Sequence, residues 1–405
     1  MKSMDRLSRL QSPHSCYTKK YMKPIYLDYA AATPVDNAAI RAAEPFLIDS
    51  FYNPSAVYQA SREVKKHLES ARTQVAHILG ARSKEIIFTA GGSEANNIAI
   101  CGVMAMYPDA HCIVSAIEHE SVLEPALQYL HTISPVSEDG IIAVESVINA
   151  ITDNTVIVSI MYANNEIGTI QPLKDIVAAV QLIRKQRRLT GNGMPLYVHT
   201  DACQAANYLD IQVQRIGVDM MTLNGGKIYS YKQSGCLYVR TGVELQPLVY
   251  GGGQERSIRS GTENVPSIMA FATMLQKVQK RRKSEITRLQ QIHNIFIATI
   301  SQKLTYTTNG SIKKRLPNNL NLTFPGSDGE RLLMELDEAG IMVATGSACT
   351  ASNDQPSHVL KAIGLSDNDA QASLRVTFGA PTTLEGTKTA AEVFCTVVGK
   401  HVRLV

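Results

Sequence analysis

A lysine at the end of a mostly apolar, strand-like run is the first residue of this chain that is placed for chemistry. Residues 218–223 form that run, and Asn224-Gly225-Gly226 separates them from Lys227. The two glycines predict a backbone with positive φ that comes close to whatever the lysine contacts. A lysine amine in such a place can form a Schiff base with a carbonyl compound, while a solvated loop lysine is the alternative.

Polar side chains also follow the other short apolar runs of the sequence. The full set is Ser93, His119, Asn165, Asp201, Gln204 and Lys227. In open α/β sheets ligands collect at the carboxyl ends of the strands, so we expect these side chains to lie at one sheet edge. Taken singly, Asp201 could instead cap a helix and His119 could be a core histidine.

A glycine turn follows the run at 85–89. The residues are Ala90-Gly91-Gly92-Ser93, and an apolar helical pattern comes directly after them. The first turn of a helix has free N–H groups, and its dipole favours negative charge. The turn therefore predicts an anion site suited to phosphate, and a plain turn is the alternative reading.

Short strands alternate with helical patterns along most of the chain. We expect strands at 25–28, 85–89, 112–116, 155–160, 196–200, 219–223, 235–240, 318–323 and 372–378, and helices at 36–47, 57–79, 263–304 and 356–362. Such alternation predicts an α/β fold with a mostly parallel sheet covered on both faces. The charged helical segment at 276–287 and the strands after it predict a second, smaller α+β domain. We place the large domain at 36–265 and the small one at 22–35 with 266–405.

Composition limits the class of protein. The 405 residues are 44% hydrophobic and 19% charged, with a net charge of only +4, which argues against nucleic-acid and anionic-membrane partners. No window approaches the roughly 18 apolar residues of a membrane span. Seven cysteines without disulfide or CxxC spacing indicate a reducing compartment, the cytoplasm, and argue against a metal site. Residues 1–21 are basic and serine-rich, and we interpret them as a disordered extension rather than a transit peptide.

Eight segments in order resemble the cysteine desulfurases of the NifS/IscS type. They are Tyr26 to Pro34, Phe88 to Glu94, Ala116 to His119, Asn164 to Gly168, His199 to Gln204, Gly225 to Tyr229, Gly251 to Thr262 and Gly346 to Cys349. The resemblance covers nearly everything from Met22 onward. It implies the type I fold of pyridoxal-phosphate (PLP) dependent transferases, here with a class V aminotransferase pattern and a seven-stranded-type sheet.

The resemblance implies a PLP site built from the same strand ends. Lys227 would hold PLP covalently and move the Cα proton, and Asp201 would keep the pyridinium nitrogen protonated. Gln204, three residues on and therefore over the same helical turn, would bind the phenolic oxygen. The remaining cofactor-binding candidates are Gly92, Ser93, His119, Asn165, Asn224, Gly226 and Thr262. Among these, His119 would stack on the ring, and Thr262 would reach the phosphate of a neighbouring subunit in a homodimer.

The same resemblance assigns the substrate and the nucleophile. Arg375 would pair with the carboxylate of L-cysteine, with a surface salt bridge as the alternative. Asn165 and Asn53 are further substrate-binding candidates. Cys349 would accept the substrate sulfur as a persulfide, leaving L-alanine, and its small, polar surroundings would let the loop move. The persulfide would pass to an acceptor protein such as an iron–sulfur scaffold or a tRNA-thiolation enzyme.

Two departures and three rival functions stay open at this point. Asn224 and Gly226 stand where the family often has serine and histidine, and Ser230-Tyr231 replaces a usual Gly-Pro. A lost charge-assisted hydrogen bond would weaken cofactor binding by about 1.5–3 kcal/mol. A selenocysteine lyase or a class V aminotransferase would share Lys227 and Asp201, although an aminotransferase needs no thiol. A non-enzymatic scaffold of the same fold is the third alternative.

Overall fold

A seven-stranded sheet lies at the centre of the molecule, with strand order β2-β8-β7-β6-β5-β3-β4. The computed structural model describes residues 24–346 and 355–402. The strands are β2 (Ile86–Thr89), β3 (His111–Ser115), β4 (Leu130–Ser134), β5 (Thr155–Ser159), β6 (Tyr197–Asp201), β7 (Met220–Asn224) and β8 (Gly235–Val239). Only β8 runs antiparallel to its neighbours, so the predicted mostly parallel sheet is confirmed.

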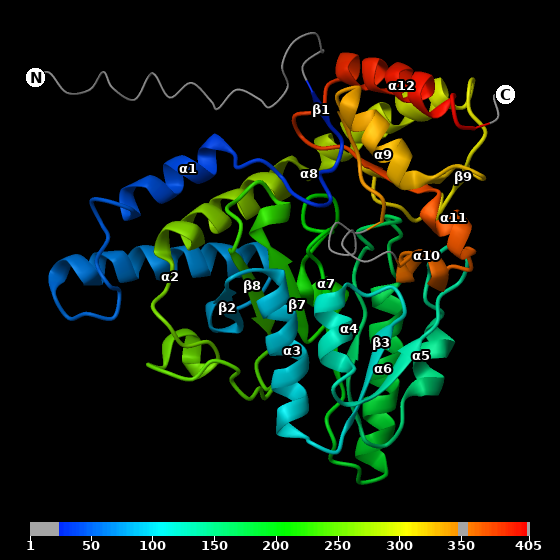
Figure 1. The fold of residues 1–405 in the computed structure, drawn as a ribbon. Helices are drawn as coiled ribbons and strands as arrows, with labels where there is room; N and C mark the ends of the chain where they lie inside the picture. Colours follow the sequence, from blue (N-terminus) through cyan, green and yellow to red (C-terminus); the bar gives the residue numbers. More distant parts are fainter. Residues whose placement is uncertain (1–23, 347–354, 403–405) are drawn as a thin grey trace, which may run out of the picture.

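Helices cover both faces of this sheet (Figure 1). They and the remaining helices are α1 (Asn37–Ala43), α2 (Gln59–Leu79), α3 (Gly92–Met106), α4 (Glu120–Ala126), α5 (Val144–Ala150), α6 (Leu173–Leu189), α7 (Val213–Ile216), α8 (Val265–Ile300), α9 (Gly329–Glu338), α10 (His358–Ala362), α11 (Asp367–Gln371) and α12 (Leu384–Val398). Along β2, Ile86 and Phe88 pack with α2, α6 and α8, whereas Ile87 packs with α3 and α4. Side chains of a strand alternate between faces, so a strand with two covered faces is apolar throughout.

Local signals in the sequence explain where the first helices begin and end. The Asp36 carboxylate accepts from the Ala38 N–H at 2.8 Å and begins α1. Helix α2 ends at Leu79, because Gly80 takes a left-handed φ of 64° and bonds back to the last turn. Both boundaries agree with the predicted helices at 36–47 and 57–79.

A second core lies around a smaller sheet. That sheet has the order β12-β10-β9, and its strands are β9 (Thr307–Thr308), β10 (Asn319–Thr323) and β12 (Ser373–Thr377). Helices α9 and α12 pack on it, and β1 (Ile25–Tyr26) pairs with β11 (Ile341–Met342) beside it. The N-terminal segment therefore joins the C-terminal part of the chain.

Helix α8 connects the two cores (Figure 1). The segments expected at 263–304 form this one 36-residue helix. Its first half, up to Val278, packs with α2 and the large sheet, and its second half, from Leu289, packs with the small sheet. The domain boundary at residues 265 and 266 remains a prediction.

Strand β4 was not predicted from the sequence: it lies at the sheet edge, and two of its five side chains are exposed, two half-buried and one buried. Over residues 24–346 and 355–402, no helix has both the length and the apolar character needed to cross a membrane. The same residues contain no group of three or more His, Cys, Asp or Glu side chains arranged to hold a metal ion.

Candidate active site

A cleft of about 250 Å³ opens at the carboxyl ends of β5, β6 and β7. It is lined by Ala30, Ala31, Gly92, Ser93, His119, Ser121, Met161, Ala163, Asn165, Asp201, Cys203, Gln204, Asn224, Lys227 and Arg375. All six polar residues predicted to meet at one sheet edge are therefore in one place. Asn224, Gly92 and Arg375 join them.

Lys227 ends a 3-10 turn, Gly225–Lys227, that directly follows β7. Its Nζ donates to the carbonyl oxygens of Ala30 at 2.9 Å and Ala31 at 2.5 Å. Its own carbonyl accepts from the Asn207 side chain at 2.7 Å. Lys227 is thus held in the cleft by its amine and by its backbone carbonyl. These contacts exclude the alternative that it is a solvated loop lysine.

The expectation of positive φ at Gly225 and Gly226 is wrong, since neither takes such a conformation. Gly225 is needed for space, because a Cβ there would lie 2.0 Å from the Ser234 Oγ. At Gly226 the nearest atom to a Cβ, the Asn224 Oδ1, would be 3.4 Å away. Neither space nor backbone geometry therefore requires a glycine at position 226.

Asp201 ends β6 with its carboxylate in the cleft, where it is 7% exposed. Oδ1 accepts from the Cys203 N–H at 2.8 Å, and Oδ2 accepts from the Asn96 side chain at 2.8 Å. No helix follows: residues 203–208 form turns, so the expectation of a helical turn shared with Gln204 is wrong. The Asp201 carboxylate is fixed by one local and one distant donor.

Asn96 is a site residue that the sequence reasoning missed. It is fully buried on α3 and also donates to the Ser121 Oγ at 2.9 Å. An asparagine one turn after the Gly92 anion turn, on an otherwise apolar face, was the available signal. Its amide connects Asp201 with the segment that carries His119.

His119 caps helix α4, and its Nδ1 accepts from the Ser121 N–H at 3.0 Å. An accepting Nδ1 leaves the proton of a neutral ring on Nε2. The ring lines the cleft, so the alternative of a core histidine away from any site is excluded. Stacking of the ring on a cofactor remains a prediction.

The predicted anion turn is the N-terminus of α3. Gly91 has a φ of 131°, which side chains rarely allow, and the 15-residue helix begins at Gly92. Ser93 is exposed in the first turn, facing the cleft. A Cβ on Gly92 would lie 2.8 Å from the Cys203 Sγ, so the turn approaches the sheet edge as closely as packing permits.

Cys203 is the one described cysteine that lines the cleft. Its burial raises the pKa of the thiol well above the ordinary value. Burial likewise raises the pKa of Cys112 to about 12. Both thiols therefore stay protonated at neutral pH, as expected of packing residues.

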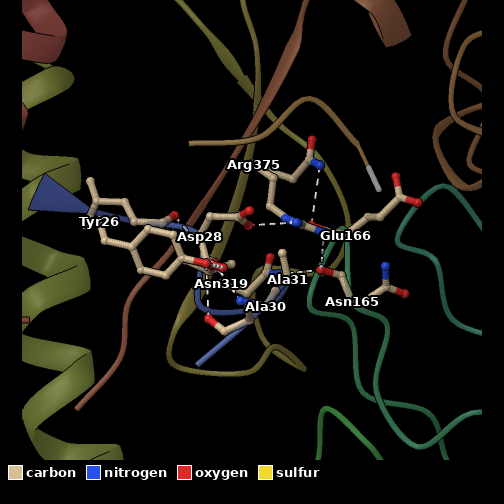
Figure 2. Close-up of polar contacts among 12 residues, drawn as sticks. Tyr26, Asp28, Ala30, Ala31, Asn165, Glu166, Asn319 and Arg375 are labelled. Carbon is tan, nitrogen blue, oxygen red and sulfur yellow. Dashed lines mark hydrogen bonds and ion pairs between the residues drawn. The ribbon is translucent and has the colours of Figure 1, made fainter. Parts of the chain in front are cut away.

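Arg375 enters the cleft from β12, on the side of the smaller sheet. Its guanidinium is buried, and Nη2 lies 2.7 Å from the Asp28 Oδ1 (Figure 2). Nη1 donates to the Asn165 carbonyl at 3.3 Å. The alternative of a surface salt bridge is wrong, because only 2% of this side chain is exposed.

Gln204 joins the same N-terminal turn. Its Nε2 donates to the Ala30 carbonyl at 2.9 Å, the oxygen that Lys227 also contacts. Residues 28–31 thus touch three of the predicted site residues. No contact of residues 28–31 with the site was predicted from the sequence.

Glu166 and Ser357 form a buried contact beside the cleft. The Ser357 Oγ donates to the Glu166 Oε2 at 2.6 Å and also caps α10. A Cβ on Gly346, whose φ is 61°, would lie 3.3 Å from the same carboxylate oxygen. Glu166 therefore bonds to Ser357 and lies close to Gly346, which are on opposite sides of residues 347–354 in the chain.

Two predicted site residues lie outside the cleft, and the structure does not describe a third. Thr262 lines a separate cavity of about 180 Å³ with Thr89 and Arg259. Asn53 is exposed in the loop before α2, where its Oδ1 accepts from the Ser55 N–H at 2.9 Å. Cys349 is outside the described residues. The roles of all three remain predictions.

Comparison with known proteins identifies the family. The aminotransferase class-V model matches residues 25–389. The cysteine desulfurase IscS of Dictyoglomus turgidum is 38% identical over 386 residues, which span 93% of this chain and 95% of that protein. A solved NifS-like protein aligns with a TM-score of 0.85 at 28% identity, over 93% of this chain and all of the other. A structure of SspA in complex with cysteine aligns with a TM-score of 0.73 at 33% identity, over 87% and 98% of the two chains.

These matches confirm the resemblance and the type I fold of PLP-dependent transferases. The chain belongs to the class V aminotransferase family and, within it, to the cysteine desulfurases of the NifS and IscS type.

Proposed function

We propose that this protein converts L-cysteine to L-alanine and leaves the sulfur as a persulfide on Cys349. The observation that carries the proposal is the meeting of Lys227, Asp201 and Arg375 in one cleft. An amine, a buried carboxylate and a guanidinium are the groups needed for a PLP ring and an amino-acid substrate. Family membership makes the chain a cysteine desulfurase, an enzyme that uses L-cysteine.

The residues of the cleft fit PLP. The N-terminus of α3, with Gly92 and the exposed Ser93, offers N–H and hydroxyl donors to a phosphate. Asp201 would hold the pyridinium proton, and Lys227 would bind the cofactor covalently. When bound, PLP supplies an electron sink for the negative charge that develops at the substrate Cα. Asn224 replaces one phosphate donor of the family, and its Oδ1 accepts from the Gly226 N–H at 2.9 Å.

Each side chain of the cleft would then have its own role in the reaction. Arg375 would bind the substrate carboxylate, and Lys227 would take and return the Cα proton. His119, with its Nε2 proton free of Ser121, would serve proton transfer at the ring face. Gln204 and the side chain of Asn165 would bind the cofactor ring edge.

Cys349 is the proposed sulfur acceptor. Its thiolate would attack the substrate sulfur, so that an S–S bond forms while the C–S bond breaks. The carbon left behind takes a proton and becomes the methyl group of L-alanine. L-cysteine and one enzyme thiol thus yield L-alanine and one enzyme persulfide.

Several assignments extend the proposal to the whole assembly. A homodimer would bring Thr262 of one subunit to the phosphate site of the other, and Asn53 to the substrate. An iron–sulfur scaffold or a tRNA-thiolation enzyme would accept the persulfide. We also propose the two-domain division at residues 36–265 and a cytoplasmic location, which the five free described cysteines support.

Sulfide and alanine release from L-cysteine with a reductant tests the reaction. Cys349→Ala should abolish sulfide release, whereas Cys395→Ala, a buried cysteine of α12, should retain it. An unchanged rate in Cys349→Ala contradicts the nucleophile assignment. Borohydride reduction and peptide mapping should place the pyridoxyl group on Lys227, and finding it on Lys232 contradicts the cofactor assignment.

A further inference from the structure

The substrate-side arginine already has a carboxylate partner within the chain. The Arg375 side chain points at the Asp28 carboxylate (Figure 2). The Arg375 Nη2 and the Asp28 Oδ1 are 2.7 Å apart, and the two side chains are only 2% and 15% exposed. A buried pair of this kind has little electrostatic screening. Asp28 therefore cancels most of the positive charge that Arg375 presents to the cleft.

The pair leaves donors for a second carboxylate. A guanidinium has five N–H donors. Asp28 and the Asn165 carbonyl are the acceptors on Nη2 and Nη1, and the buried Nε has no hydrogen-bond partner within the described structure. Arg375 can thus hold a ligand carboxylate without losing Asp28.

Asp28 itself is held firmly. The Tyr26 hydroxyl lies 2.8 Å from the Asp28 carbonyl and 3.1 Å from the Ala32 carbonyl, so it closes the turn between them. The Ala30 N–H donates to the Thr377 Oγ1 at 3.0 Å, two residues beyond Arg375 on β12. The turn and the arginine strand are therefore fixed to each other, and the carboxylate stays aimed at the guanidinium.

We propose that Asp28 is a positioning residue that orients Arg375 and limits how tightly the cleft holds an amino-acid carboxylate. The inference rests on the proposed function. L-cysteine and L-alanine carry the same carboxylate, so an uncompensated buried arginine would retain the product as firmly as the substrate. A second carboxylate on the same guanidinium is repelled by Asp28, which costs roughly tenfold in affinity.

Asp28→Asn in the PLP-loaded enzyme tests this role. The amide keeps the size of the side chain and an oxygen to accept from Nη2, and it removes only the charge. We expect the KM for L-cysteine and the inhibition constant of L-alanine both to fall roughly tenfold. L-alaninamide, which lacks the carboxylate charge, should bind equally to both enzymes. Asp210→Asn, at the more exposed pair with Arg215, is the matched control and should change neither constant.

Constants that rise or stay unchanged in folded, PLP-loaded Asp28→Asn overturn the inference. Asp28→Ser also removes the charge and keeps an acceptor, and it carries the same expectations should the amide variant not fold. Binding of L-alanine, followed by calorimetry, reports on Asp28 whether or not sulfide is released. A wild-type enzyme that releases no sulfide would overturn the proposed function, and this outcome is therefore distinct.

Discussion

Two regions of the cleft are built in different ways. The sheet-edge group, which consists of Gly92, Ser93, His119, Asp201 and Lys227, lies at the carboxyl ends of β2, β3, β6 and β7 of one sheet. Within it, Asp201 and His119 each accept a hydrogen bond from the backbone N–H two residues further along the chain. The Arg375–Asp28 pair joins residues 347 positions apart in the chain.

Side chains in these two regions depend on their neighbours in different ways. Asp201 and His119 keep a local backbone donor when a distant side chain changes. In the Arg375–Asp28 pair each charge fixes the other, so a change in one is felt at once by its partner. We therefore expect changes in the pair to alter substrate affinity, and changes around the sheet-edge group to alter stability or cofactor binding.

Arg375→Lys should have the largest effect. Lysine keeps the charge but loses the planar fork that can serve Asp28 and a ligand together. Loss of a charged hydrogen bond of about 1.5–3 kcal/mol raises the KM for L-cysteine roughly tenfold to a hundredfold. Steady-state kinetics measures this KM. Arg331→Lys, at an exposed pair with Glu335, is the control. An unaltered KM would mean that the pair does not serve the substrate.

Glu118→Gln tests whether the buried Glu118, which precedes His119 of the sheet-edge group, makes stability depend on pH. Burial raises the pKa of Glu118 to about 8, although the Ser115 hydroxyl and the Met161 N–H both donate to its carboxylate. Between about pH 4.5 and 8 the folded chain keeps this proton while the unfolded chain has lost it, so stability falls as pH rises. The variant should remove this decline and gain a few kcal/mol on wild type between these limits.

Denaturant unfolding at both ends of that range is the measurement. His199 contributes in the opposite sense, because burial lowers its pKa to about 4 and stability is lost as pH falls from 6.5 toward that value. Comparing the variant with the wild type at each pH cancels the contribution of His199 to stability, because both proteins contain it. Glu338→Gln, at an exposed position, is the control. A stability difference that does not grow with pH would contradict the buried, protonated state of Glu118.

Substitution of the two glycines before Lys227 should give the smallest effects. Gly225→Ala places a Cβ 2.0 Å from the Ser234 Oγ and should cost about 1–3 kcal/mol of stability. Gly226→Ala meets only ordinary contacts and should change stability by less than about 0.5 kcal/mol, with PLP retained. Unfolding midpoints and cofactor content measure both. Equal losses in the two variants would show that position 226 also requires a glycine.

Local patterns predicted most of the fold and the sheet-edge group. Apolar runs followed by polar residues placed Asp201, Lys227 and His119 correctly, since strand ends of a parallel sheet meet at one edge. Errors arose where the local pattern had several solutions. The alanine-rich segment after Asp201 is compatible with a helix or with turns. Gly225 is needed for space rather than for backbone freedom.

Sequence periodicity and glycine turns suffice to predict the sheet, the glycine turn before α3 and the position of Lys227. Those features depend on hydrogen bonds and side-chain alternation within a few residues. The partner of Arg375, the Asn96 contact with Asp201 and the attachment of Lys227 to Ala30 and Ala31 depend on the tertiary structure. Burial makes these contacts strong, and burial is decided only when distant parts of the chain pack together. For this reason the charge balance around Arg375 became visible only in the folded molecule.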